Sequence, residues 1–236
     1  MENINIVVLN SSTFLGLDKI IKEIIGYDNL SVCISDIDSF AYGDKINTSV
    51  PDVVWINTNS RDLMKQDVDS FYSTLESVWS RIPEDRIVVQ NNFEFCRHSI
   101  SSKKVIEINQ KIESRSRAVK NFYLCDINKI SNKIGLQNWY NDEYWYSFKI
   151  PYDRKYIPDV VNSLKRIISK ANNDIKKCLV LDLDNTLWGG VIGDDGLEGI
   201  KIGRDDPIGE AYSDFQKYVK GLPTKGVLLA VCSKNN

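Results

Sequence analysis

Short apolar runs and amphipathic stretches alternate along residues 3–126, and this alternation limits the possible folds more than any other feature. Strands that alternate with helices favour parallel pairing, with right-handed crossovers and helices on both faces of the sheet. We therefore predict a five-stranded, flavodoxin-like α/β domain. The expected strands lie at residues 4–9, 30–35, 53–57, 86–90 and 122–125, and the expected helices at residues 14–25, 62–80 and 102–119.

Polar residues follow three of these strands directly. In a parallel sheet such residues lie at the carboxyl edge, where α/β folds bind ligands. The same residue types also cap the helices that follow, and we favour capping over a binding pocket here. The residues are Asn10, Ser11, Ser12, Asn57, Thr58, Asn59, Gln90, Asn91 and Asn92.

This layout resembles the SGNH hydrolase fold, which places a serine after the first strand and an asparagine after a later one. The chain departs from that pattern, because no G-D-S surrounds Ser11 or Ser12 and residues 139–145 contain no D-x-x-H. The only histidine, His98, follows the fourth strand, in the wrong place for that family's base. A serine without a base is a poor nucleophile, so we expect a domain without a full hydrolase triad and without esterase activity.

Residues 138–146, N-W-Y-N-D-E-Y-W-Y, form the densest aromatic stretch of the chain. We expect it to pack at a structural interface between domains, and we favour this over stacking on nucleic acid because no basic stripe accompanies it. A helix is predicted over residues 157–171. The polar stretch after that helix places the domain boundary, so the predicted domains are residues 1–174 and 175–236.

Residues 177–193 read K-C-L-V-L-D-L-D-N-T-L-W-G-G-V-I-G. We predict a strand over residues 178–181 that is buried on both faces and runs directly into Asp182, with Asp184 and Thr186 at alternate positions. One carboxylate in such a turn can act as nucleophile or metal ligand, and the other can transfer protons. The alternative is that these polar residues only cap the turn.

Three further elements are expected in this second domain. Residues 191–202 should form a small hairpin around D-D-G. A helix should start at Pro207 and run to about residue 220, because proline is favoured at the first helical position. Residues 226–232 should form a second buried strand, which ends at Ser233.

The stretch D-L-D-N-T-L-W-G-G-V-I-G-D-D-G resembles the first motif of the haloacid dehalogenase (HAD) superfamily and, more narrowly, its FkbH-like branch, subfamily IIIC. The resemblance implies a Mg²⁺-dependent phosphatase or phosphotransferase. Asp182 would form an aspartyl-phosphate and Asp184 would act as acid and base, while Mg²⁺ would be held by Asp182 and by the backbone carbonyl of Asp184. The second motif would lie at Ser233. The residues that would bind the phosphorylated substrate are Thr186, Ser233, Lys234 and Asn235.

For the FkbH-like branch, the resemblance also implies a phosphoglycerate-type small-molecule substrate and an acyl carrier protein as partner. The family's lysine or arginine and its further acidic pair, which lie on later strands, do not occur here. We therefore expect residues 175–236 to be the first part of a HAD-like domain, with motifs I and II only, in a longer protein. We expect the chain alone to be inactive. The alternative is a docking module for a carrier protein or a sugar intermediate.

Composition and charge limit the partners and the cellular compartment that we expect for this protein. The net charge is −2 and the basic residues are scattered, which gives no electrostatic case for binding nucleic acid or an anionic membrane. The apolar run near the N-terminus is too short for a signal peptide or a membrane span. The five cysteines show no C-x-x-C spacing. Reduced thiols in a cytoplasmic protein are therefore expected.

Overall fold

The computed structural model describes residues 4–13, 16–41, 51–95, 102–172 and 177–234. The chain divides into two compact units, Met1–Asn173 and Asp174–Asn236. Each unit is described by itself below. No helix in these ranges is both long enough and apolar enough to cross a bilayer.

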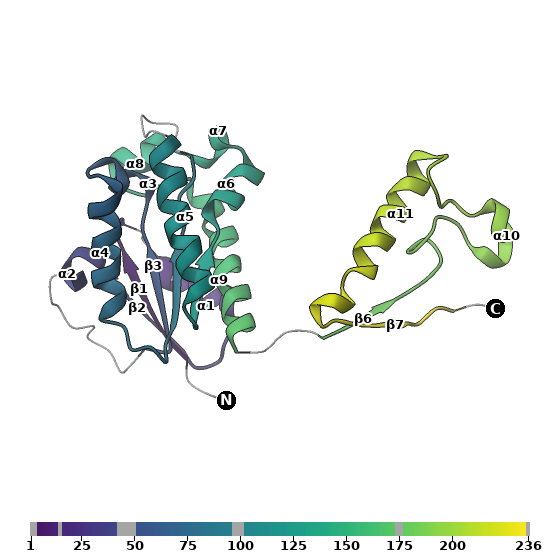
Figure 1. The fold of residues 1–236 in the computed structure, drawn as a ribbon, viewed down its shortest axis with the longest axis horizontal. Coiled ribbons are helices and arrows are strands. Elements are labelled where there is room, and N and C mark those ends of the chain that lie inside the picture. Colours follow the sequence, from purple (N-terminus) through teal and green to yellow (C-terminus); the bar gives the residue numbers. More distant parts are fainter. Residues whose placement is uncertain (1–3, 14–15, 42–50, 96–101, 173–176, 235–236) are drawn as a thin grey trace. The chain divides into compact units, whose positions relative to one another are not determined.

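The first unit is built on a five-stranded parallel sheet with the order β2-β1-β3-β4-β5 (Figure 1). This is the flavodoxin-like order, so the predicted α/β fold class is confirmed. The predicted strands are also confirmed, with ends that differ by one residue at most. The strands are β1 (Ile4–Asn10), β2 (Leu30–Asp36), β3 (Val53–Asn57), β4 (Ile87–Asn91) and β5 (Phe122–Cys125).

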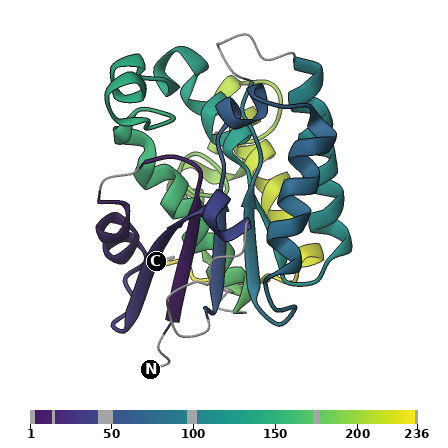
Figure 2. The same ribbon diagram turned by 90° about the vertical axis from the view of Figure 1, so that its left-hand side faces the viewer.

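Helices cover both faces of this sheet, as predicted (Figures 1 and 2). The helices of the first unit are α1 (Leu17–Ile25), α2 (Ile37–Ala41), α3 (Ser60–Met64), α4 (Val68–Ser80), α5 (Ser102–Ala118), α6 (Ile127–Ile134), α7 (Leu136–Trp139), α8 (Asp142–Phe148) and α9 (Ile157–Ala171), with a short 3₁₀ turn, η1 (Arg154–Tyr156). Successive side chains of a strand point to opposite faces, and β1 shows this directly. Ile6 and Val8 pack with α1 and α9, whereas Val7 and Leu9 pack with α2, α4 and α5.

The single helix predicted over residues 62–80 is wrong, because the structure has two helices there. Asn59 caps α3 by accepting a hydrogen bond from the Arg61 amide (2.9 Å). Asp67 then caps α4 by accepting one from the Ser70 amide (2.9 Å). A side-chain cap requires an extended backbone at its own residue, so Asp67 ends the helical path and starts another.

The aromatic stretch at residues 138–146 packs largely inside the first unit. Trp139 is fully buried in the core and stacks on Tyr152, with ring centroids 4.3 Å apart. The guanidinium of Arg61 lies 4.1 Å from the ring centroid of Trp145. Among the aromatic residues of this stretch, Tyr146 alone remains largely exposed. The predicted interface between domains is therefore wrong for Trp139, which joins α7 to the core of the first unit.

The second unit contains β6 (Cys178–Leu181) and β7 (Leu228–Val231), which pair in parallel, and α11 (Pro207–Lys220), which begins and ends as predicted. Asp206 caps α11 by accepting a hydrogen bond from the Gly209 amide (3.2 Å). The predicted hairpin at residues 191–202 is wrong. A kinked helical segment, α10 (Ile192–Gly199), lies there, and a short 3₁₀ turn, η2 (Pro223–Lys225), precedes β7. Lys201, near the end of the expected hairpin, instead forms an antiparallel bridge with Gly189, which precedes it.

The strands of the second unit are more exposed than the sequence suggests. Both were predicted to be buried, yet Val180 is 58% exposed and Leu228 is 70% exposed. Leu181 is the one residue of β6 that is buried. Within the described ranges the sheet has only these two strands, and one long helix cannot cover both faces of a sheet. The described part of this unit therefore leaves much of the apolar surface of β6 and β7 exposed.

The buried thiol of Cys125 provides a test of the first unit's core. Burial raises the pKa of Cys125 to about 12, so at pH 8 its thiolate fraction is about a thousandfold below that of a thiol with a pKa near 9. We predict that iodoacetamide at pH 8 labels the exposed Cys178 and Cys232 but not Cys125. Peptide mass spectrometry measures this. Labelling should begin only near pH 12 or on unfolding, and rapid labelling of the folded protein at pH 8 would contradict the buried position.

Candidate functional site

Parallel pairing brings the two predicted motifs of the second unit to one sheet edge. Leu181 at the end of β6 pairs with Val231 at the end of β7, and the Cys232 amide donates to the Leu181 carbonyl (2.9 Å). Asp182 and Cys232 therefore leave the sheet side by side, and Ser233 follows one residue later. The arrangement places a carboxylate and a hydroxyl at the carboxyl edge of the sheet, where α/β folds bind ligands.

Asp184 is held by one of its two carboxylate oxygens. Its Oδ1 accepts hydrogen bonds from the Trp188 indole Nε1 (3.0 Å) and from the Ile192 amide (3.1 Å). Its Oδ2 has no hydrogen-bond partner among the described residues. The carboxyl group is therefore fixed in orientation while one oxygen remains available to exchange a proton.

Asp182 is exposed, and its Oδ1 accepts a hydrogen bond from the next amide, that of Leu183 (2.8 Å). The Leu183 carbonyl in turn accepts from the amides of Thr186 (3.2 Å) and Leu187 (2.8 Å), which closes a tight turn after the strand. Thr186 is half-buried in this turn, and its hydroxyl makes no hydrogen bond within the described part of the chain. The turn thus directs Asp182 outward, as a nucleophile or metal ligand requires.

A loop over residues 185–190 fixes the position of Asp184. Asn185 adopts a left-handed backbone (φ 52°), which asparagine tolerates better than most residues. Its Oδ1 accepts from the Gly190 amide (2.9 Å), and its own amide donates to the Gly190 carbonyl (3.2 Å). Gly190 has φ +100°, and a Cβ there would lie 2.7 Å from Oδ2 of Asp195, which accepts a bond from the Val191 amide.

Helix α11 supports the same loop from outside. The Tyr212 hydroxyl donates to the Asn185 carbonyl (3.4 Å), and the Gln216 Nε2 donates to the Leu187 carbonyl (2.6 Å). A Cβ on Gly189 would come within 2.9 Å of the Tyr212 ring, so glycine permits this close approach. Sequence reasoning missed this supporting role, although the paired glycines Gly189 and Gly190 were a usable signal.

The predicted substrate-binding residues at the end of β7 differ in their surroundings. The Ser233 hydroxyl oxygen is buried and has no hydrogen-bond partner in the described ranges. A buried polar atom left in that state is costly, by about 1–3 kcal/mol, and native structures seldom keep one without a reason. Lys234 is exposed. Asn235, the fourth predicted residue, lies outside the described residues.

The carboxylates here fit a hard cation with few protein ligands. Asp182 and Asp184 are two residues apart, and no group of three or more His, Cys, Asp or Glu residues in the described ranges is arranged to hold a metal. Mg²⁺ commonly binds through one or two carboxylates and keeps several waters, whereas zinc sites use three or four protein ligands, mostly histidine and cysteine. The donor set therefore suits Mg²⁺.

The polar strand ends of the first unit form a network across neighbouring strands. The Asn57 side chain donates to Oδ1 of Asn10 (3.1 Å), and the Asn91 side chain bonds both the amide and the carbonyl of Thr58 (2.8 Å each). The predicted capping role holds for Asn59 at α3. His98 lies outside the described residues. These amides therefore act mainly between strands and only in part as helix caps.

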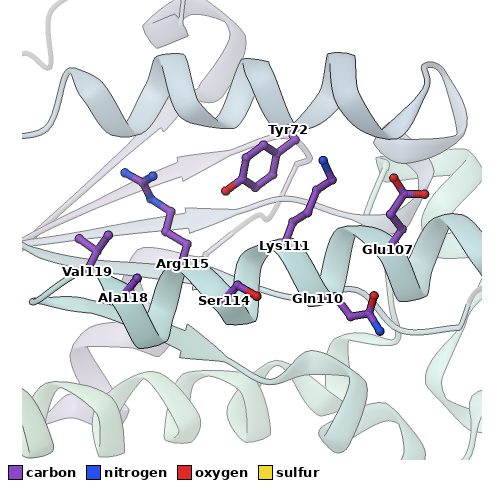
Figure 3. A pocket seen from close by; sticks show the side chains of 8 residues that line it. All are labelled: Tyr72, Glu107, Gln110, Lys111, Ser114, Arg115, Ala118 and Val119. Atoms are coloured by element: carbon purple, nitrogen blue, oxygen red, sulfur yellow. The ribbon is translucent and has the colours of Figure 1, made fainter.

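A separate cavity of about 570 Å³ lies between α4 and α5 (Figure 3). Tyr72 projects into it from α4, while Lys111 and Arg115 project from α5. Lys111 is already paired with Asp69 (2.9 Å), and the cavity also carries the acidic Glu107. The cavity carries charges of both signs and lies on the outer surfaces of two helices. Its side chains do not converge on one ligand position, so we do not regard it as the functional site.

Comparison with known proteins gives similarity in structure only. No family model matches the chain, and neither does any curated protein. A crystal structure of the N-terminal part of the protein BF1531 from Bacteroides fragilis, which contains a phosphatase domain and was determined in complex with Mg, superposes with a TM-score of 0.85 at 24% identity. The match covers 100% of this chain and 70% of that one. It shows that the two chains share a fold.

Carbohydrate esterases also resemble this chain in structure. A family 3 carbohydrate esterase from Clostridium thermocellum matches with a TM-score of 0.54 at 12% identity, over 73% of this chain and 98% of its own. A carbohydrate esterase of family 3 from Talaromyces cellulolyticus matches with a TM-score of 0.52 at 10% identity, over 73% of this chain and 100% of its own. The α/β fold with its parallel sheet is thus one that hydrolases also use, and fold alone does not carry an activity.

The contact between Gly190 and Asp195 can be tested with a matched pair of variants. We predict that Gly190→Ala destabilises the loop by about 1–3 kcal/mol, because alanine is strained at positive φ and its Cβ would meet Asp195. Gly193→Ala should be neutral or slightly stabilising, since its Cβ would meet nothing within 4 Å. The measurement is the indole N–H resonance of Trp188 during thermal unfolding. Equal effects of the two variants would contradict the contact.

Proposed function

We propose that the second unit belongs to a Mg²⁺-dependent phosphatase or phosphotransferase of the HAD type, FkbH-like, that works through an aspartyl-phosphate. The observation that carries this proposal is the meeting of Asp182, Asp184 and the buried Ser233 hydroxyl at one edge of a parallel sheet. The structural similarity to a phosphatase-domain protein determined with Mg supports the proposal. On this view residues 1–174 form an SGNH-like domain and residues 175–236 form part of a HAD-like domain.

Mg²⁺ would be held by the carboxylate of Asp182 and the backbone carbonyl of Asp184, with water completing its shell. The outward carboxylate of Asp182 and the fixed position of Asp184 in the turn are compatible with that role. When bound, the cation supplies positive charge that offsets the combined charge of carboxylate and phosphate. The remaining chemistry belongs to the side chains of the chain itself.

Asp182 would act as the nucleophile. One of its carboxylate oxygens would attack phosphorus, and the bond from phosphorus to the leaving oxygen would break. Asp184 would give its proton to that leaving oxygen from Oδ2, while Trp188 and the Ile192 amide keep Oδ1 in place. Asp184 would then take a proton from water, which attacks the aspartyl-phosphate, releases phosphate and restores Asp182.

The Ser233 hydroxyl would hold a phosphoryl oxygen. A bound anion would provide the partner that this buried hydroxyl lacks among the described residues, and hydrogen bonds to ionised oxygens are stronger than neutral ones. The exposed Lys234 would contribute positive charge, and Thr186 and Asn235 would complete the binding set. The proposed substrate is a phosphorylated small molecule of the phosphoglycerate type, with loading of its acyl group onto an acyl carrier protein in the cytoplasm. Resemblance to the FkbH-like branch motivates these last assignments.

Metal binding can be observed at Trp188, the one tryptophan that follows residue 173. Its indole N–H donates to Asp184, so a cation held by the backbone of that residue should shift the indole resonance. We predict a saturable shift on Mg²⁺ titration and selective broadening with Mn²⁺. In Asp182→Asn the response should require at least tenfold more metal, because the charged ligand is lost. An unchanged response in that variant would place the metal elsewhere.

Phosphorylation of the nucleophile can be tested without requiring multiple turnovers. We predict that acetyl phosphate with Mg²⁺ yields a single phosphoryl adduct on Asp182, detected by mass spectrometry at low pH and absent from Asp182→Asn. Acetate leaves without needing a proton, so Asp184→Asn should still be phosphorylated. Its adduct should persist about 10²–10⁴-fold longer, because no base activates water.

The Asp184→Asn variant retains an oxygen that can accept hydrogen bonds from Trp188 and the Ile192 amide. It should therefore keep the loop folded while it loses the group that transfers protons. Two results would contradict the assignment of roles. One is an adduct that survives Asp182→Asn, and the other is an adduct lifetime that is unchanged in Asp184→Asn.

A further inference from the structure

The first unit contains its own topological switch point, separate from the site of the second unit. In the order β2-β1-β3-β4-β5 the chain crosses from β1 outward to β2 and then returns to β3 on the other side. Ligands of open α/β sheets bind in the crevice that this reversal leaves at the carboxyl edge. Ser11 follows β1 and Thr58 follows β3, so both lie at this crevice.

A pocket of about 80 Å³ occupies this place. Ser11 and Thr58 form a polar wall from the strand ends, and Ile37, Phe71 and Leu75 form an apolar wall from α2 and α4. The apolar residues are buried and belong to the core on that face of the sheet. A pocket of this size holds only a few non-hydrogen atoms. It suits a group with a short carbon chain on one side and a hydrogen-bonding atom on the other.

The hydroxyl of Ser11 is held by two neighbours that leave it one acceptor position. Asn59 Nδ2 donates to Ser11 Oγ (3.0 Å), and Ser11 in turn hydrogen-bonds the Asp62 carboxyl. Asp62 is itself fixed, because its Oδ2 accepts from Asn59 Nδ2 (2.7 Å) and from the Asn59 amide (3.2 Å). A hydroxyl has one donor hydrogen and two acceptor positions, so Ser11 can accept one further hydrogen bond. A ligand hydroxyl would provide that donor.

The charges around the pocket disfavour an anion. Asp62 and Asp38 line it, and Lys65 is the one cation among its lining residues. The Lys65 ammonium already pairs with Asp62 (3.3 Å), and the Lys65 side chain is 75% exposed. Burial raises the pKa of Asp62, which shows that its surroundings already resist negative charge. A carboxylate or phosphate in this pocket would place a further negative charge close to Asp62, which is unfavourable.

We propose that this pocket binds the uncharged, hydroxyl-bearing end of a small ligand, an alcohol or polyol with a short carbon chain, by a hydrogen bond to Ser11 Oγ and apolar contact with Phe71 and Leu75. This is binding without hydrolysis, since the carboxyl beside Ser11 is taken up by Asn59 and Lys65. The proposal is independent of the phosphoryl chemistry assigned to the second unit, because no residue is shared between the two sites.

The test compares two probes of equal size, propane-1,2-diol and propionate, by NMR of the ¹⁵N-labelled full chain. The diol should give saturable shifts of the Ser11, Thr58 and Asp62 amides, with a dissociation constant on the order of 1–10 mM for so few atoms. Propionate should bind at least tenfold more weakly because of its charge. Shifts that grow linearly without saturation, or equal binding of the two probes, would overturn the proposal.

Three variants locate the binding. Thr74→Phe places a large side chain in the pocket and should abolish diol binding, whereas Ser73→Phe on the exposed side of α4 should leave it unchanged. Ser11→Ala should weaken diol binding about fivefold, because one hydrogen bond to the ligand is lost. This variant decides the test if Thr74→Phe does not fold. Asp182→Asn should have no effect, so failure here stays distinguishable from failure of the phosphatase proposal. Diol binding that persists in both Thr74→Phe and Ser11→Ala would refute the site.

Discussion

The structure depends most on parallel hydrogen bonding between strands that are distant in sequence. In the second unit the pairing of β6 with β7 brings Asp182 and Ser233 together across about fifty residues of chain. In the first unit the same kind of pairing brings the residues after β1 and β3 together. Because all strands of a parallel sheet end at one edge, polar residues placed after separate strands meet there without any contact between them being encoded locally.

The parts of the fold that were predictable from sequence are those fixed by local apolar pattern. The strand at Val53–Asn57 begins with a continuous apolar run of four residues, and such runs mark strands buried on both faces. The break at Asp67 was missed because residues 62–80 keep a helical pattern across it, and only the capping geometry decides between one helix and two. The exposure of Val180 was unpredictable for another reason: an apolar strand looks the same whether or not other elements cover it.

Some features of the candidate site could also be predicted from local sequence, whereas others depend on contacts between distant residues. The roles proposed for Asp182 and Asp184 follow from spacing after a strand, which a sequence displays directly. The contact of Tyr212 with Asn185 joins residues 27 positions apart and becomes visible only when α11 has packed. The Ser11–Asn59–Asp62 cluster likewise spans two strand ends, so the sequence could suggest either capping or binding but could not choose between them.

The loop after β6 restricts which amino acids can occupy it before any reaction is considered. A glutamate at position 184 would carry its carboxylate one methylene too far to accept from both Trp188 and the Ile192 amide. At position 185 the backbone excludes β-branched residues, and the bond to the Gly190 amide requires a short side chain with an acceptor. Invariance of this stretch among relatives would therefore be expected from folding alone. An intact motif in a related protein thus indicates a correctly built loop, and evidence of activity has to come from elsewhere.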